Sequence, residues 1–103
     1  MDKKTVIEQT EKYYLPVFGR NQMVIDHGQG CHVWDNEGNE YVDCFAGIAV
    51  NSLGYNHPAL VKAITEQAQK VMHCSNLYYT EIQAKAVRVT ADATGMDRVF
   101  YAN

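Results

Sequence analysis

The chain has 103 residues, of which 47% are hydrophobic and 20% are charged, and its formal net charge is −3. This composition is typical of a globular protein and excludes a disordered chain. Lys and Arg are scattered among Asp and Glu, so the sequence offers no basic face for a nucleic acid.

Nothing in the sequence indicates a membrane protein or a secreted one. The longest apolar stretch, Cys44 to Val50, is far shorter than the roughly 20 residues that span a bilayer. The N-terminus lacks the apolar run of a signal peptide. We therefore expect a cytoplasmic protein with no membrane partner.

The first elements are a short helix and an aromatic arm. The helix is predicted over Lys3 to Lys12, with Val6 and Ile7 as its apolar residues. The run from Tyr13 to Phe18 contains Pro16, which favours an extended backbone. We expect this arm to lie over another part of the protein.

A three-stranded antiparallel meander is predicted next. The strand signals are Met23–Ile25, Cys31–Asp35 and Glu40–Asp43. The turn signals between them are His27–Gly30 and Asp35–Asn39. The two residues Gly28 and Gly30 could also suggest a dinucleotide-binding loop, but no third glycine follows and the segment leads into a strand. We interpret both as hairpin glycines.

Two amphipathic helices follow the meander. The first is predicted to begin at Pro58 and to run to about Met72. Thr80 is predicted to cap the second, with Gln83 completing a capping box, and Gly95 to end it in a left-handed conformation.

The last apolar run, Arg98 to Ala102, resembles a strand buried on both faces. Such a strand needs a neighbour on each side, and nothing upstream supplies a parallel partner. We therefore expect the chain to be part of a longer protein.

The cysteines are expected to be buried free thiols. Cys31, Cys44 and Cys74 are odd in number and widely spaced, as in a reducing compartment. The pairs Cys31-His32 and His73-Cys74 have ligand types that zinc accepts, but not the spacing of a standard zinc finger. We predict no metal site.

Several ordered motifs resemble one enzyme family. They are Gly28–Asp43, Gly47–Gly54, His57–Val61, Ser75–Tyr78 and Arg98–Asn103. Together they resemble the N-terminal part of the class III pyridoxal-phosphate-dependent aminotransferases, most closely the branch that acts on acetylornithine. The resemblance covers almost the whole chain from Tyr14. One departure is Tyr55, where many relatives have a histidine.

The resemblance implies an α/β fold, namely the N-terminal fragment of a fold type I pyridoxal-phosphate-dependent transferase. Residues 1–57 would form an arm and a meander of the small domain. Residues 58–103 would form a helix pair that leads into the first strand of the large-domain sheet.

The implied function is transfer of an amino group from N-acetylornithine to 2-oxoglutarate in arginine biosynthesis, by a homodimer. Two alternatives stay open. One is a class III transaminase that uses ornithine, succinylornithine or 4-aminobutyrate. The other is a free-standing noncatalytic interaction module.

No catalytic or cofactor-binding residue is expected within these 103 residues. In the resembled family the phosphate loop, the aromatic residue on the cofactor ring, the aspartate at its nitrogen and the covalently bound lysine all come later. The lysines here lie in polar helical contexts, where an amine stays protonated. We expect pyridoxal 5'-phosphate in the full-length protein and not bound to this fragment alone.

Three residues are candidates for the substrate-binding wall. Ile48 is the first, because ornithine-specific relatives look to have a tyrosine there and an aliphatic side chain leaves room for an acetyl amide. Ile48 could instead be ordinary core. Tyr14 on the arm and Asn76 in a loop are weaker candidates, and Asn76 could be only a turn residue.

Overall fold

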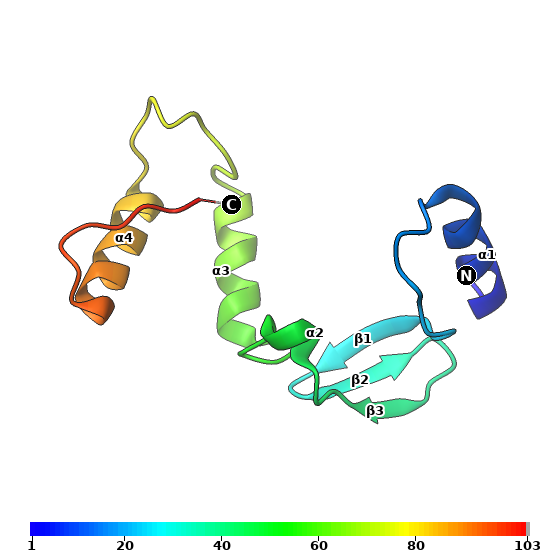
Figure 1. The fold of residues 1–103 in the computed structure, drawn as a ribbon. Coiled ribbons are helices and arrows are strands. Elements are labelled where there is room, and N and C mark those ends of the chain that lie inside the picture. The colour runs from blue at the N-terminus through cyan, green and yellow to red at the C-terminus, as the bar shows by residue number, and fades with distance from the viewer. Residues whose placement is uncertain (103) are drawn as a thin grey trace. The chain divides into compact units, whose positions relative to one another are not determined.

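The computed structural model describes residues 1–102, which fall into two compact units, one from Met1 to Glu66 and one from Gln67 onward. Each unit is described by itself. Figure 1 labels the helices and strands along the chain. Their bounds are α1 Lys3–Tyr13, β1 Ile25–Gln29, β2 His32–Asp35, β3 Glu40–Val42, α2 Ala46–Ala49, α3 Pro58–Ala68 and α4 Glu81–Thr94.

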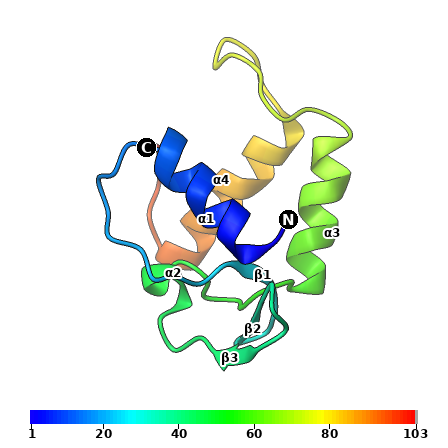
Figure 2. The ribbon, with the colours of Figure 1, turned by 90° about the vertical axis from the view of Figure 1, so that its right-hand side faces the viewer.

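The N-terminal helix forms where the sequence predicts it, because Asp2 caps it. The Asp2 carboxylate accepts hydrogen bonds from the Thr5 backbone N–H at 2.9 Å and from the Thr5 hydroxyl at 2.7 Å. The arm that follows has no helix or strand up to β1 (Figure 2). Phe18 on this arm is 70% exposed, so the predicted packing of the arm over another part of the protein is not seen for this residue within the described chain.

The predicted antiparallel meander is confirmed, with strand order β1-β2-β3. The bounds of its first strand are wrong at both ends. The segment His27–Gln29 belongs to β1 and pairs with β2 from His32 to Trp34, so it is not a turn. The hairpin turns instead at Gly30 and Cys31, and the positive φ of 58° at Gly30 makes that short connection possible. The strand also begins at Ile25 and not at Met23.

The buried residues of the described chain lie in β2. Val33 is 7% exposed and Asp35 is 4% exposed. The Asp35 carboxylate accepts hydrogen bonds from the backbone N–H groups of Glu37 and Asn39, from the Asn39 amide, and from the Tyr41 hydroxyl at 3.0 Å. These bonds, the Asn39 side-chain bond first, lower the pKa of Asp35 from 3.8 to about 2. A charged acceptor therefore fixes the turn between β2 and β3.

The helix α3 begins at Pro58 as predicted, and α4 has the predicted caps at Thr80 and Gly95. The Thr80 hydroxyl accepts from the Gln83 backbone N–H at 3.3 Å, and Gly95 ends α4 with φ 70°. The helix α3 is shorter than predicted and ends at Ala68. Backbone bonds from Lys70 and Val71 return to Gln67 and form a last turn, a common way for a helix to end short of its apolar pattern.

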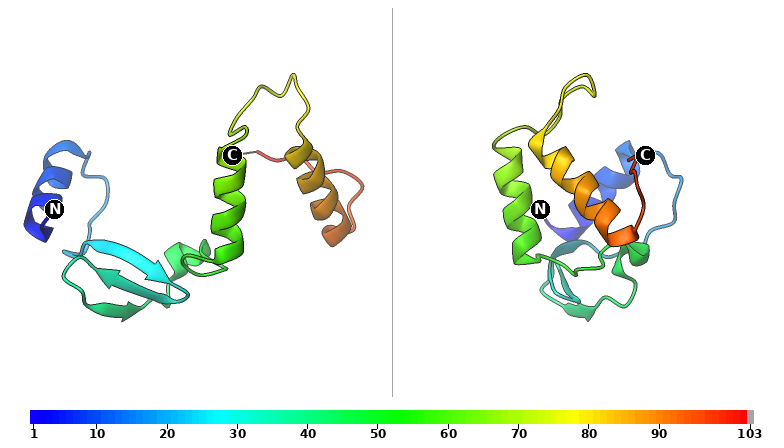
Figure 3. Two further views of the ribbon diagram at one scale, coloured as in Figure 1. Left: turned by 180° about the vertical axis from the view of Figure 1, so that it is seen from behind. Right: turned by 90° about the vertical axis from the view of Figure 1, so that its left-hand side faces the viewer.

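The predicted strand over Arg98–Ala102 is not formed among the described residues. The segment folds back along α4 instead, where the Tyr101 hydroxyl lies 2.6 Å from the Thr90 hydroxyl (Figure 3). Phe100 is 88% exposed. A strand exists only through hydrogen bonds to a neighbouring strand, and the described chain offers none beside this segment.

The predicted burial of the cysteines is also wrong within residues 1–102. Cys31 and Cys44 are exposed and Cys74 is partly exposed, all three as free thiols. The reason is that the described units have almost no core, so an apolar pattern alone does not bury these side chains. No group of three or more metal-ligating side chains occurs in this part of the chain. No helix over the same residues is long and apolar enough to cross a membrane.

Candidate functional site

The element that carries Ile48 has an unusual backbone. Its residues Ala46, Gly47, Ile48 and Ala49 have φ values of 49°, 61°, 62° and 60°. Four successive positive values define a left-handed turn, which we call the α2 turn. Left-handed backbone costs a residue other than glycine roughly 1–2 kcal/mol, and for a β-branched residue such as Ile48 it is a genuine outlier. The α2 turn therefore stores strain that its surroundings must offset.

Asp43 is the first contact that holds the α2 turn. One oxygen of its carboxylate accepts hydrogen bonds from the backbone N–H of Phe45 at 2.8 Å and of Ala46 at 2.9 Å. Both N–H groups lie at the entrance of the turn. The other carboxylate oxygen accepts from the Tyr55 hydroxyl at 2.8 Å. The Tyr55 bond and then the two backbone bonds lower the pKa of Asp43, and the same contact raises the pKa of Tyr55.

Gly28 makes room for Tyr55. A Cβ at Gly28 would lie only 2.4 Å from Cγ of the Tyr55 ring and 2.7 Å from its Cβ. Two backbone hydrogen bonds between Gly30 and Tyr55, of 2.9 and 2.7 Å, fix the same approach. The loop after the α2 turn is therefore closed onto the β1–β2 hairpin, and Tyr55 reaches Asp43 from that side.

Ile48 is not core within the described chain, since it is 76% exposed. The Ala46 carbonyl accepts hydrogen bonds from the backbone N–H groups of Val50 and Asn51, both at 2.8 Å. The backbone on either side of Ile48 is thus hydrogen-bonded while its side chain is free. Such an arrangement presents an apolar group to whatever lies against the turn.

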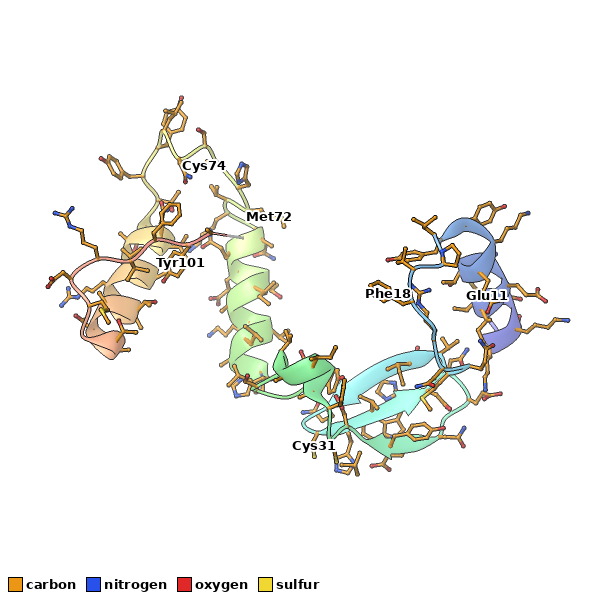
Figure 4. All side chains as sticks on the ribbon, in the orientation of Figure 1. Glu11, Phe18, Cys31, Met72, Cys74 and Tyr101 are labelled. Carbon is orange, nitrogen blue, oxygen red and sulfur yellow. The ribbon has the colours of Figure 1, made fainter. Side chains whose placement is uncertain are left out.

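Tyr14 lies at another place in the same unit. It lines a groove of about 630 Å³ between α1 and the arm, together with Val6, Thr10 and Phe18. Figure 4 shows the labelled Phe18 on the arm and Glu11 on α1, which also line this groove. The Arg20 guanidinium stacks on the Tyr14 ring at 4.4 Å. Ile48 is not among the groove residues, so the structure does not bring these two candidates together.

Asn76 belongs to the second unit and is described within it. It lies in a turn, since the Tyr78 N–H donates to the Ser75 carbonyl at 3.0 Å and the Leu77 N–H donates to the Ser75 hydroxyl at 3.2 Å. It also lines a hollow of about 560 Å³ beside α4, with Tyr101 on its far side. Both interpretations of Asn76, turn residue and pocket residue, are compatible with this placement.

Four of the described lysines lie beside glutamates. Lys3 donates to Glu37 at 2.8 Å, and this bond raises its pKa. Lys4, Lys62 and Lys85 each lie beside a glutamate one helical turn away. A lysine that attacks a carbonyl needs a lowered pKa, the opposite direction. Lys3, whose pKa is raised, therefore does not fit covalent attachment of pyridoxal phosphate.

Sequence reasoning missed Asp43 and Tyr55 as site-supporting residues. Asp43 was read as the end of a strand, and Tyr55 only as a departure from a family pattern. A local signal was available for Asp43, because an aspartate side chain commonly accepts a hydrogen bond from the backbone two residues further on and so begins a turn. Its partner Tyr55 lies twelve residues away along the chain, where no local pattern points to it.

Comparison with known proteins identifies the family. The model of the class III aminotransferases matches residues 15–103. The chain belongs to the class III aminotransferase family.

Its curated relatives include acetylornithine aminotransferases of two archaea. The protein of Methanosarcina acetivorans is 52% identical over 99 residues, which cover 96% of this chain and 25% of the relative. The protein of Methanothermobacter thermautotrophicus is 46% identical over 103 residues, covering 100% of this chain and 26% of the relative. The chain thus spans about a quarter of the length of the curated relatives that it matches.

Solved structures of an acetylornithine aminotransferase and of an ornithine aminotransferase contain the fold of this chain. Acetylornithine aminotransferase from Elizabethkingia anophelis superposes with a TM-score of 0.91 at 28% identity, over 95% of this chain and 26% of that one. Ornithine aminotransferase from Toxoplasma gondii gives 0.89 at 28% identity, over 95% of this chain and 23% of that one. The predicted fold class, an N-terminal portion of such an enzyme, is confirmed. Fold similarity alone does not show whether the amino donor is N-acetylornithine or ornithine.

Proposed function

We propose that this chain is the N-terminal part of an aminotransferase that moves the amino group of N-acetylornithine to 2-oxoglutarate. The observation that carries the proposal is the sequence similarity of 46% and 52% over nearly the whole chain to acetylornithine aminotransferases. Residues 1–57 contribute to the small domain, and residues 58–103 lead into the large domain. The role of these residues is architectural and substrate-facing.

Pyridoxal 5'-phosphate supplies the electron sink of the reaction when bound to the full-length protein. We propose that a residue outside this segment holds it. We propose that the full-length enzyme is a cytoplasmic homodimer. The exposed aromatic residues of the arm, including Phe18, support an interface at that arm.

Ile48 is the proposed contact for the acyl group of the donor. An exposed aliphatic side chain on a fixed turn offers apolar surface and no hydrogen-bond donor. It therefore favours a neutral acetyl amide over the charged amine of free ornithine, which would lose its water there. Tyr14 and Asn76 remain candidates for the same wall.

A second candidate function is transfer from ornithine itself, since the chain shares its fold about as closely with the Toxoplasma gondii ornithine aminotransferase. The test is to measure kcat/KM of the full-length protein with N-acetylornithine, N-succinylornithine, ornithine and 4-aminobutyrate. The proposal expects N-acetylornithine to give the highest value. Preference for another of these donors would replace the proposed substrate, and transfer from none of them would support a noncatalytic module.

A further inference from the structure

The backbone of the α2 turn is strained, so other contacts must hold it in that conformation. Three of its residues, Ala46, Ile48 and Ala49, are not glycine and yet have positive φ. Left-handed backbone is unfavourable for each of these residues, so the turn is strained at three positions. Such strain persists only where the surrounding contacts fix the backbone, and it gathers at binding and catalytic sites.

Backbone hydrogen bonds among residues 45–51 hold the turn internally, and the described side-chain hydrogen bonds to its backbone come from one carboxylate. Asp43 joins the two backbone N–H groups at the entrance of the turn to the Tyr55 hydroxyl. Tyr55 is itself held by its backbone bonds to Gly30, and its ring occupies the space that Gly28 leaves open. The β1–β2 hairpin, Tyr55, Asp43 and the α2 turn thus form one connected chain of contacts.

The exposed end of this chain of contacts is the Ile48 side chain. A hydrogen bond to a charged acceptor is directional and stronger than one between neutral groups, so it sets where the turn lies relative to the hairpin. If Ile48 contacts the amino donor, a substitution at Tyr55 displaces Ile48 and so alters donor binding, although Tyr55 itself does not contact the donor.

We propose that Tyr55 and Asp43 are positioning residues for amine-donor recognition: their hydrogen bond holds the left-handed turn that presents Ile48 to the acyl group of the donor. The inference rests on the proposed function for its donor, and on the geometry of residues 28–55 for its mechanism. The two parts therefore have separate readouts.

The principal variant is Tyr55→Phe in the full-length protein, which removes the hydroxyl and keeps the ring against Gly28. The matched control is Tyr41→Phe, because the Tyr41 hydroxyl also donates to an aspartate, Asp35, but away from the α2 turn. If Tyr55→Phe fails to fold, Asp43→Asn provides the second variant. This variant leaves one acceptor oxygen, which cannot accept hydrogen bonds from the backbone N–H groups and from the Tyr55 hydroxyl at the same time as the two carboxylate oxygens do.

The first readout is hydrogen exchange of the backbone amides from Phe45 to Asn51. Tyr55→Phe is expected to speed exchange there, and Tyr41→Phe is not. The second readout is the ratio of kcat/KM for N-acetylornithine to that for ornithine. Tyr55→Phe should lower this ratio about 2- to 10-fold, the factor that a typical net hydrogen bond represents, through KM and with kcat unchanged.

Two further variants separate positioning from general structural support. In an Ile48→Ala background, Tyr55→Phe should leave the donor ratio unchanged, because the side chain that it positions is absent. Tyr55→His should lower the donor ratio less than Tyr55→Phe does, since an imidazole N–H can donate to Asp43.

Unchanged exchange in Tyr55→Phe would overturn the positioning role. Faster exchange with an unchanged donor ratio, or an equal effect of Tyr41→Phe on that ratio, would overturn the link to the donor. If the wild-type protein transfers from neither donor, the proposed function is wrong and the donor part of the inference falls with it. The exchange result still decides whether Tyr55 holds the turn.

Discussion

Two turns of this protein are each held by an aspartate that accepts a hydrogen bond from a tyrosine, but the two pairs act on different kinds of backbone. In the turn between β2 and β3, the Tyr41 hydroxyl donates to Asp35, and Asp35 accepts the backbone N–H groups of that turn. In the α2 turn, Tyr55 donates to Asp43, and Asp43 again accepts backbone N–H groups. The Asn and Gly residues of the first turn favour its backbone, and Asp35 adds hydrogen bonds to it. The second is strained at three positions.

The comparison teaches that an aspartate–tyrosine pair can either support a preferred backbone or hold a disfavoured one. The first use stabilises the sheet. The second fixes an exposed side chain, Ile48, at a defined place. Substitutions in the full-length protein should distinguish these two uses.

Asp35→Ala should give the largest loss of stability. Four donors, from Glu37, Asn39 and Tyr41, lose their common acceptor at the most buried side chain of the described residues. The measurement is the thermal unfolding midpoint. Asp92→Ala is the matched control, because its partner Arg88 lies 3.6 Å away in a solvent-exposed pair, and such pairs contribute little. Equal midpoints for the two variants would contradict the role of Asp35.

Gly28→Ala should destabilise by about 1–3 kcal/mol, the usual cost of forcing extra atoms into filled space. The added Cβ meets the Tyr55 ring near its attachment to the backbone, so the ring cannot swing away without moving the loop. Gly19→Ala is the control, since no atom lies within 4 Å of a Cβ there and its φ is not positive. A Gly28→Ala protein as stable as the control would show that the approach of Tyr55 is not required.

The contribution of Asp35 should depend on pH in a definite direction. Its pKa in the folded protein is about 2, below the ordinary value of 3.8. Its stabilising bonds are therefore fully present above about pH 4 and are lost as the pH falls toward 2. The difference in unfolding midpoint between wild type and Asp35→Asn should shrink over that range. A constant difference from pH 5 to pH 2 would show that the charge of Asp35 is unimportant.

The same sign applies to Asp43, whose pKa is also lowered. The midpoint difference between wild type and Asp43→Asn should therefore shrink as the pH falls below the ordinary carboxyl pKa. If protonation of Asp43 releases the α2 turn, amide exchange from Phe45 to Asn51 should speed up in the same range. Exchange that follows only its intrinsic pH dependence would argue against this.

The parts of the fold that sequence predicts are those with local signals. The turn Asp35–Asn39 and the caps at Thr80 and Gly95 contain all their information within a few residues, and the structure confirms them. Gly28 was misread because the reason for it is a contact with Tyr55, 27 positions further along the chain. An apolar pattern does not provide its own hydrogen-bonding partner, so the predicted strand over Arg98–Ala102 is not formed among the described residues.

The candidate site was predictable only in part. Ile48 was singled out by resemblance, and its exposure agrees with a contact role without testing it. The left-handed backbone at Ile48 was invisible in the sequence, because an Ala-Gly-Ile-Ala run favours no such conformation apart from its one glycine. It arises from Asp43 and Tyr55, which meet only in the folded chain.

The most direct test of the account is a pair of identical substitutions, Ala49→Gly and Ala63→Gly, compared by equilibrium unfolding. Ala49 has φ 60° in the α2 turn, so glycine removes strain and should stabilise the protein by about 1 kcal/mol. Ala63 lies inside α3, where glycine should destabilise by a similar amount of about 1 kcal/mol. Opposite signs are the predicted result. Destabilisation by both substitutions would contradict the strained turn on which the positioning of Ile48 depends.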